Sequence, residues 1–224
     1  MNIVTPGVVL SRKQYGEYGR MAMIYTRDLG KVVARLAGVD RPKAKLKAFS
    51  EPMVCAEYRL YLRPGSSWVT VTGGRIIDCY PDLRLDLDRM LGGLEMCELL
   101  LRLTPEHSPN PKKYELITHF LAAFADNASP WLPLAFGLRL LELLGIGSDE
   151  TQIHVEDREI FERLINDPIE ALPSPLWGEE EGERGKHIHR LHEFLLRTAE
   201  VYLQRPLEVP RVRASLKIPI EVPA

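Results

Sequence analysis

The chain has 224 residues, of which 45% are hydrophobic, so a core can form without disulfides. It contains no run of eighteen apolar residues, which argues against a transmembrane helix, and its N-terminus has no basic region followed by a long apolar stretch, so we expect no signal peptide and a cytoplasmic location. Three widely spaced cysteines without a CxxC motif argue against a disulfide framework or a zinc site, and we expect Cys55, Cys79 and Cys97 to be reduced and mostly buried.

The formal net charge of −2 conceals an asymmetry along the chain. Residues 1–80 hold 13 Lys or Arg against 6 Asp or Glu, a net of +7, and the remainder holds 16 against 25, a net of −9. A basic first part joined to an acidic remainder suggests a polyanionic partner for the first part. The alternative is that the excess charge only solvates the surface.

Residues 1–80 read as a small β-barrel. Short runs rich in β-branched and aromatic residues alternate with turn signals. Gly30 follows Asp28-Leu29 and suits the positive φ of a tight hairpin, and Gly73-Gly74 marks either a hairpin turn or a β-bulge. About five strands without a long helix predict a five-stranded OB-fold. The runs cover residues 7–10, 20–26, 31–36, 53–62, 68–72 and 75–79.

The same region carries the side chains that bind single-stranded nucleic acid in OB-folds. Such domains combine a basic groove with aromatic residues on which bases stack. The segment 40–47 has a cation at nearly every second position, and strand alternation turns some of the aromatic candidates inward, where they would be core residues. The candidate stacking residues are Tyr15, Tyr18, Tyr25, Tyr58, Tyr61 and Trp68.

After Pro81 the apolar residues recur at helical spacing. Asp82 is a plausible N-cap for the first helix, and Gly145 is expected to end the third, which is apolar on most sides and should be the central helix. The tail from Pro206 contains a β-like SLKIPIEV that either packs back or stays free. The fold class is therefore α+β, with domains 1–80 and 81–224 and an irregular insert at about 146–185. The helices are expected at 82–101, 112–125, 128–144, 157–165 and 186–204.

Catalytic motifs are not found. No GxxxxGK[ST], GxGxxG or GxSxG pattern occurs. His187, His189 and His192 resemble metal ligands, but a polar helix start explains the same residues. The carboxylate pairs Asp86/Asp88 and Glu95/Glu98 lie among leucines without a nucleophile and read as a solvated face. We therefore expect no enzyme activity, no catalytic residue, no metal and no cofactor.

Several segments, in order, resemble one family, the bacterial DNA repair proteins RecO. The first is GVVLSRKQYGEYGRMAMIYTRDLGK, followed by the loop GVDRPKAKL and by EPMVCAEYRLYL. The remainder contributes YPDLRLDLDRM, SPNPKKYELITHFL, FGLRLLELLGI and HRLHEFLLRTAEVYLQRPL. The family has the same order of an OB barrel followed by helices, so the resemblance spans nearly the whole chain.

The resemblance implies a recombination mediator and not an enzyme. Such a protein binds single- and double-stranded DNA, anneals complementary strands and helps to load the RecA recombinase onto DNA coated by single-strand-binding protein. The implied partners are DNA, RecR, in some bacteria RecF, and the C-terminal tail of the single-strand-binding protein, with RecA engaged indirectly and no membrane. The implied location is the cytoplasm, in association with the nucleoid.

Together with the resemblance, the basic residues of the barrel become candidates for phosphate contacts, which offer charge and do not read bases. They are Arg12, Arg20, Arg27, Lys31, Arg35, Arg41, Lys43, Lys45 and Lys47. The third helix, with Trp131, Leu134 and Phe136, is expected to be core; in the alternative, part of it lines a pocket for the apolar end of a partner peptide. The basic residues that would then meet the acidic part of the peptide are Arg102, Lys112, Lys113 and Arg139.

Two departures from the family pattern matter. Many members carry a four-cysteine zinc module after the LELLG helix, but residues 146–165 contain no cysteine, so we expect no zinc. Asp40 stands where the family commonly has a basic or neutral residue, and it either weakens DNA contact or pairs with Arg41. Three other function classes stay open: a general single-stranded nucleic-acid binder, a diverged scaffold with weak DNA affinity, and an enzyme with a histidine metal centre.

Overall fold

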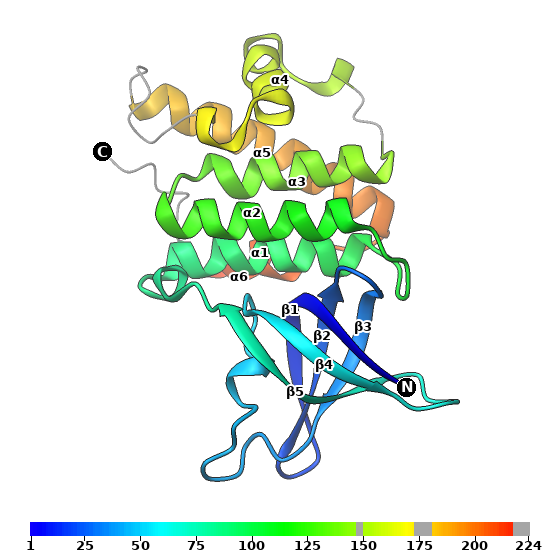
Figure 1. Cartoon of the computed structure of the whole chain (residues 1–224). Coiled ribbons are helices and arrows are strands. Elements are labelled where there is room, and N and C mark those ends of the chain that lie inside the picture. Colours follow the sequence, from blue (N-terminus) through cyan, green and yellow to red (C-terminus); the bar gives the residue numbers. More distant parts are fainter. Residues whose placement is uncertain (147–149, 173–180, 217–224) are drawn as a thin grey trace. The chain divides into compact units, whose positions relative to one another are not determined.

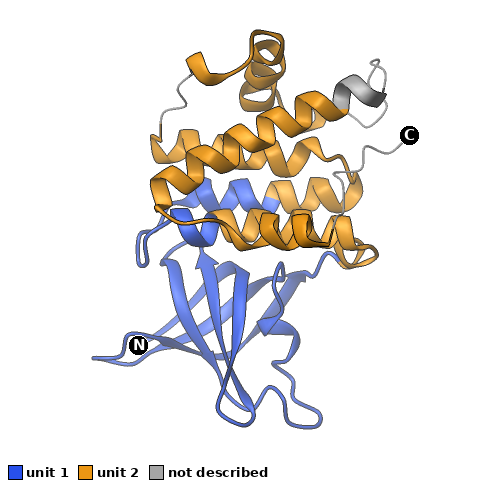
Figure 2. Ribbon diagram, turned by 180° about the vertical axis from the view of Figure 1, so that it is seen from behind, with its two compact units in different colours: residues 1–80, 100–118 blue, residues 81–99, 119–224 orange. Residues whose placement is uncertain are grey.

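The computed structural model describes residues 1–146, 150–172 and 181–216 (Figure 1). Contacts divide the chain into two compact units: unit 1 comprises residues 1–80 and 100–118, and unit 2 comprises residues 81–99 and 119–224 (Figure 2). The boundary after residue 80 is not a clean division of contacts, because the end of the first helix and the start of the second belong with the barrel.

Unit 1 contains the predicted five-stranded closed barrel, in the order β1-β2-β3-β5-β4. Antiparallel pairing joins β1 to β2, β2 to β3, β4 to β5 and β1 to β4, whereas β3 and β5 pair in parallel. Closure leaves no free strand edge. The strands are β1 (Asn2–Tyr15), β2 (Gly19–Thr26), β3 (Gly30–Leu36), β4 (Cys55–Leu62) and β5 (Val69–Asp78).

Register shifts interrupt the pairing of these strands at three places, two of them between β4 and β5. In β1 the register with β2 shifts between Val9 and Ser11, and this long strand pairs with β4 along its first half. Gly73 and Gly74 lie inside β5 in register with Arg59 and Tyr58, and the register shift at Arg59/Leu60 leaves the preceding Thr72 without a partner on β4. The glycine pair therefore adjoins a bulge and does not form a turn, and β5 joins two predicted strand runs into one strand.

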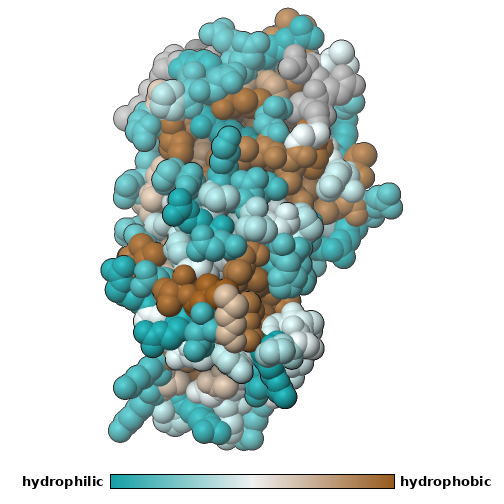
Figure 3. All heavy atoms as spheres, turned by 45° about the vertical axis from the view of Figure 1, so that its right-hand side comes forward, coloured by the Kyte–Doolittle hydropathy of each residue, from teal (hydrophilic) through white to brown (hydrophobic). Residues whose placement is uncertain are grey.

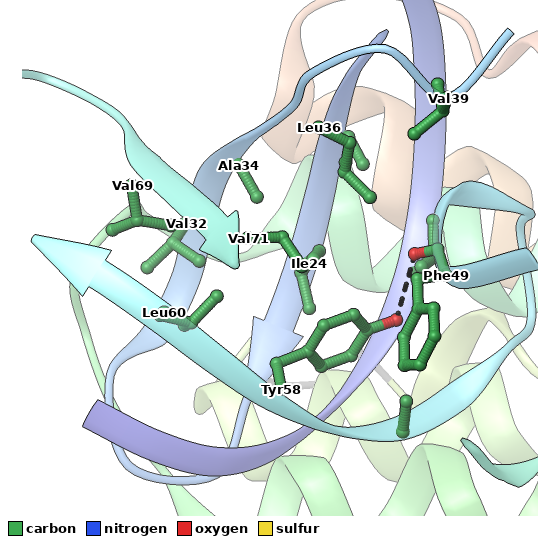
Figure 4. Packing of buried hydrophobic residues seen from close by; sticks show 13 residues of the cluster. Ile24, Val32, Ala34, Leu36, Val39, Phe49, Tyr58, Leu60, Val69 and Val71 are labelled. Atoms are coloured by element: carbon green, nitrogen blue, oxygen red, sulfur yellow. Dashed lines mark hydrogen bonds between the residues drawn. The ribbon is translucent and has the colours of Figure 1, made fainter. Parts of the chain in front are cut away.

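The barrel core is built from alternating residues of all five strands, and within it Tyr58 packs beside Phe49 (Figure 4). The phenolic oxygen of Tyr58 donates a hydrogen bond of 3.2 Å to the carbonyl of Phe49, and the two rings meet edge to face at 6.0 Å. Because Phe49 comes from the 3₁₀-helix η1 (Ala48–Ser50), this contact ties the segment between β3 and β4 to the barrel interior.

The helices are α1 (Leu87–Leu103), α2 (Pro111–Asp126), α3 (Trp131–Leu144), α4 (Arg158–Asn166), α5 (Glu181–Leu203) and α6 (Glu208–Ser215), with short 3₁₀ turns between some of them. As predicted, α3 is buried on most of its surface, and it packs against α4 and α5 within unit 2. Trp131, Leu134 and Phe136 all lie in the core. Gly145 ends α3 with a φ of 67°, also as predicted.

Two predicted details at helix ends are wrong. The first α-helix begins at Leu87 and not at Asp82, which lies in the 3₁₀-helix η2 (Pro81–Arg84). Asp86 is the residue at the start of α1 whose side chain accepts a hydrogen bond, from the Arg89 backbone N–H at 2.8 Å. In the tail, residues 208–215 form α6, which was not predicted; most of the β-like SLKIPIEV falls outside the described residues.

A polar latch holds α6 to α1 inside unit 2. Both carboxylate oxygens of Glu98 on α1 accept 2.8 Å hydrogen bonds, one from the Glu208 backbone N–H and one from that of Val209. They satisfy two donors that the first turn of any helix leaves unpaired. A guanidinium–carboxylate pair between Arg213 and Asp88 fixes the other end of α6. No helix of the described residues is both long and apolar enough to cross a membrane.

Candidate nucleic-acid interface

The nine predicted phosphate contacts fall into two groups, and the members of the first, Arg12, Arg20, Arg27 and Lys31, face carboxylate or carbonyl groups of unit 1. Arg20 is only 11% exposed at its side chain, and its guanidinium donates to Asp40 Oδ1 at 2.6 Å, to Glu51 Oε1 at 2.8 Å and to Ser50 Oγ at 3.0 Å. Arg12 also pairs with Glu51, at 2.6 Å. These pairs fasten the segment between β3 and β4 to the β1–β2 hairpin.

This network gives Asp40 a partner other than the one considered from the sequence. Burial raises the pKa of the Asp40 carboxyl, but the hydrogen bonds from Arg20 outweigh that effect and hold the pKa below its usual value. Asp40 therefore stays ionised at neutral pH and neutralises Arg20, not Arg41.

Lys31 is not a surface cation, because its side chain links β3 to the C-terminal end of α1. Its side chain is buried, and the ammonium donates to the carbonyl of Leu101 at 2.6 Å and to that of Thr104, at the C-terminal end of α1. Burial lowers the pKa of Lys31, and nearby Glu106 partly opposes that shift. A cation at the end of a helix also faces the negative end of its dipole. Arg27 remains exposed and lies 3.6 Å from Glu115.

The second group is exposed and consists of Arg35 on β3 and four cations of the segment between β3 and β4. The guanidinium of Arg35 lies 5.8 Å from the centre of the Tyr15 ring, and that of Arg41 lies 5.5 Å from the centre of the Tyr18 ring. Tyr15 and Tyr18 flank the β1–β2 turn and are 45% and 41% exposed. Such cation–π pairs hold the rings in place without burying them.

Three lysines of the following segment complete this surface. Lys43, Lys45 and Lys47 are exposed. Backbone hydrogen bonds from Arg41 N to Gly38 O and from Ala44 N to Arg41 O form successive turns, and Lys43 has a φ of 64°. In Figure 1 the β1–β2 turn and segment 37–48 lie together at the lower end of the barrel. We call this surface the loop patch; it consists of Tyr15, Tyr18, Arg35, Arg41, Lys43, Lys45 and Lys47.

The loop patch has the chemistry that single strands require. Its five cations can neutralise phosphates, and its two tyrosine rings offer faces on which unpaired bases can stack. The two cation–π pairs each join a candidate phosphate-binding arginine to a candidate stacking tyrosine, two kinds of residue that the sequence alone did not connect. Of the other aromatic candidates, Tyr25 and Tyr58 are fully buried and cannot stack, whereas Tyr61 and Trp68 are each 40% exposed.

The basic-residue list from the sequence missed four exposed cations of the barrel, namely Lys13, Arg59, Arg63 and Arg75. Strand pairing would have found the first, because Lys13 is in register with Met21 on β2, and Met21 is in register with Arg35 on β3. Residues directly opposite each other point to the same face of a sheet. Lys13 therefore lies on the same outer face as Arg35.

The four residues predicted to meet a partner peptide do not form one cluster within a unit. Arg102, Lys112 and Lys113 belong to unit 1, and Arg139 belongs to unit 2. Lys112 is exposed, whereas Lys113 is buried and burial lowers its pKa. The guanidinium of Arg139 donates to the carbonyls of Leu164 at 2.7 Å and Asp167 at 2.5 Å and lies over the Phe120 ring, so it holds the end of α4.

The three histidines of α5 have carboxylate partners that do not converge. His187 pairs with the buried Asp157, and His192 Nε2 lies 2.5 Å from Glu95 Oε1 on α1. His189 is exposed beside Glu193. Burial lowers the pKa of His192, but the charge and hydrogen bond of Glu95 more than offset this, so the pKa of His192 lies above its usual value. Among the described residues, no group of three or more side chains is arranged to hold a metal ion.

Comparison with known proteins relates both parts of the chain to one family. Residues 1–80 match the family model "Recombination protein O N terminal", and residues 84–175 match "Recombination protein O C terminal". A DNA repair protein RecO from Heliobacterium modesticaldum is 30% identical over 214 residues, which cover 94% of this chain and 76% of that protein.

Two further relatives match over shorter segments. The DNA repair protein RecO of Bacillus mycoides is 28% identical over 141 residues, which cover 62% of this chain and 56% of that protein. That of Pelotomaculum thermopropionicum is 30% identical over 138 residues, which cover 62% of this chain and 53% of that protein. The closed barrel, the helices that follow it and these matches agree, and the chain belongs to the RecO family of DNA repair proteins.

Proposed function

We propose that this chain is a recombination mediator whose barrel binds DNA through the loop patch. It would bind single- and double-stranded DNA, anneal complementary strands and help to load RecA onto DNA coated by single-strand-binding protein. The observation that carries the proposal is the pair of exposed tyrosines, each under an arginine, beside three exposed lysines on the next loop. Phosphates would bind the cations, and unpaired bases would stack on the rings.

Internal hydrogen bonds and ion pairs lead us to propose fewer DNA contacts than the nine basic residues predicted from the sequence. Arg20 and Lys31 have their donors occupied inside unit 1, so we assign them to holding the barrel together and not to DNA. Arg35, Arg41, Lys43, Lys45 and Lys47 remain as the main contacts. Arg12 and Arg27 are partly exposed but face carboxylates, and we propose that they contribute less.

Protein partners form the second part of the proposal. RecR and the acidic C-terminal tail of the single-strand-binding protein would bind this chain, and RecA would be engaged indirectly. Of the four basic residues considered for the tail, we propose Lys112, because it is exposed, whereas Lys113 is buried and Arg139 is occupied by two carbonyls. The chain would act by binding, without breaking covalent bonds, in the cytoplasm at the nucleoid.

Two other functions have specific observations in their favour. Contacts between phosphates and the cations of the loop patch would carry no sequence information, which also suits a general single-stranded nucleic-acid binder. The internal pairing of Arg12, Arg20 and Lys31 reduces the available charge, which suits a protein scaffold with weak DNA affinity.

Strand annealing separates these functions. We expect the wild-type chain to raise the initial rate at which two complementary labelled strands anneal by at least about tenfold at low salt, because neutralised phosphates no longer repel each other. Fluorescence energy transfer between the two labels measures the rate, and a reaction without protein is the control. Binding without faster annealing would favour the general binder, and no binding at all would favour the scaffold.

A further inference from the structure

The outer surface of β4 carries a row of side chains outside the loop patch. Tyr58 and Leu60 point into the barrel core, so strand alternation places Arg59 and Tyr61 on the outside, and the exposed Arg63 follows one residue after β4 ends. Tyr61 is 40% exposed although it is a large aromatic residue. Two arginines therefore flank an exposed ring at a spacing of two residues.

Trp68 joins this row from the β4–β5 turn, one residue before β5 begins. Tyr61 is in register with Thr70 and Leu62 with Val69, so Trp68 lies diagonally from Tyr61, within reach of a long aromatic side chain. The β4–β5 turn holds Trp68 in position: Ser66 Oγ donates to the Trp68 carbonyl at 2.9 Å, and the Trp68 backbone N–H donates to Ser66 Oγ at 3.3 Å. The indole is nevertheless 40% exposed.

The charges around these rings favour an anionic ligand. Arg59 and Arg63 are exposed, and neither forms an ion pair within the described residues. The acidic side chain of this row, Glu57, is in register with Arg75 on β5. In Figures 1 and 2 the β4–β5 loop projects from a corner of the barrel apart from the loop patch, and Figure 3 brings that side forward as a mixed hydrophilic and hydrophobic surface.

Strand register joins the two surfaces. Thr70 on β5 pairs with Tyr61 on β4 and with Arg35 on β3, so the three lie in one row across neighbouring strands. At about 4.8 Å between strands, roughly 10 Å of backbone separates Tyr61 from Arg35. A strand bound at the Tyr15–Arg35 pair can therefore continue onto β4 without leaving the barrel surface.

We propose that Tyr61 and Trp68, flanked by Arg59 and Arg63, form a second stacking surface for unpaired bases, which extends the loop patch. This inference rests on the proposed function, because it assumes that the loop patch binds DNA. The ligand class is single-stranded nucleic acid. Bases of a duplex are already stacked and cannot lie on the rings, so this surface makes the barrel prefer single strands over duplexes.

Paired substitutions on the full-length chain test the surface. In the double variant Tyr61→Ser, Trp68→Ser, affinity for a labelled oligothymidine should fall by at least about tenfold, since stacking on each ring contributes about five- to 150-fold. Affinity for a duplex of equal length should change less than about twofold, because its contacts are phosphate contacts. The matched control is Tyr202→Ser, which removes a 58% exposed aromatic residue of α5 and should change neither affinity.

Tryptophan fluorescence gives a second readout. Trp131 is 2% exposed and Trp177 lies outside the described residues, so Trp68 is the described tryptophan that a base can reach. Oligothymidine should quench the wild-type emission, and Trp68→Phe should abolish the quench while it keeps affinity within about twofold, because phenylalanine also stacks. This variant separates contact at position 68 from any change in folding.

The outcomes distinguish failure of the inference from failure of the proposed function. If the wild type binds neither single strands nor duplexes, the proposed function fails. If the wild type binds both, and the double variant either keeps both affinities or loses affinity for single strands and duplexes equally, the stacking surface is wrong while DNA binding stands. If the double variant keeps its DNA affinities but loses a protein partner, the surface belongs to that partner and the inference is overturned.

Discussion

Replacing Arg41, Lys43 and Lys45 together with glutamate is expected to lower affinity for a single strand by at least about 100-fold at low salt. Each substitution removes an attraction to phosphate and adds a repulsion of similar size, and a hundredfold loss corresponds to only about 2.7 kcal/mol over three residues. All three side chains are exposed, so the barrel should keep its stability. Fluorescence anisotropy with a labelled strand measures the affinity.

A charge-matched control tests whether the position of the substituted charges or the net charge of the protein governs DNA affinity. Replacing Arg158, Arg197 and Arg205 with glutamate changes the net charge by the same amount at exposed positions of unit 2. Measured at about 0.1 M salt, this control should retain most of the affinity, because screening there limits the reach of a charge to about 10 Å. Equal losses in both variants would show that overall charge, and not the loop patch, governs binding.

Gly30→Ala is expected to destabilise unit 1 by about 3 kcal/mol or more. Gly30 has a φ of 69°, which costs an L-residue about 1 kcal/mol. An added Cβ would also lie 2.5 Å from the backbone carbonyl of Ser108, and overpacking against backbone costs a further 1–3 kcal/mol or so. Urea denaturation of the purified chain measures the loss.

Gly65→Ala is the control for the backbone conformation alone. Gly65 has a φ of 73°, but no atom lies within 4 Å of its added Cβ. It should therefore cost about 1 kcal/mol, the part of the Gly30 effect that comes from φ. If the two variants lose the same stability, the close approach between the β2–β3 turn and Ser108 does not contribute.

The local features of the barrel could be predicted because they depend on neighbours in the sequence. Alternation located the strands, and Gly30 was assigned correctly to a hairpin turn because few other residues adopt its backbone conformation. Gly73-Gly74 had two readings, turn or bulge. Only the register of β5 against β4 distinguishes them, because it depends on residues 59 and 60 of another strand.

The roles of individual charges could not be predicted, because they depend on residues far apart in the chain. Arg20, Lys31 and Arg41 look alike in a basic sequence. Folding brings Asp40 and Glu51 to the first, carbonyls 70 and 73 residues away to the second, and the Tyr18 ring to the third. Sequence composition counts these cations equally, whereas in the structure only the last of the three is exposed.

Helix α6 escaped prediction for a related reason. It has eight residues and a proline, and by itself would be too short to be stable in water. Pro210 is tolerated because it lies in the first turn, where its missing N–H has no intrahelical acceptor. What stabilises the helix is the carboxylate of Glu98, 110 residues earlier in the chain, which accepts from two of its N–H groups.

The salt dependence of single-strand affinity tests the central claim, that exposed cations of the barrel bind DNA, most directly. If the five cations of the loop patch engage about five phosphates, the logarithm of the association constant should fall with the logarithm of salt concentration at a slope of roughly −3 to −4. Anisotropy titrations of the wild type at several salt concentrations measure it. A slope near zero, or no binding at low salt, would contradict the claim.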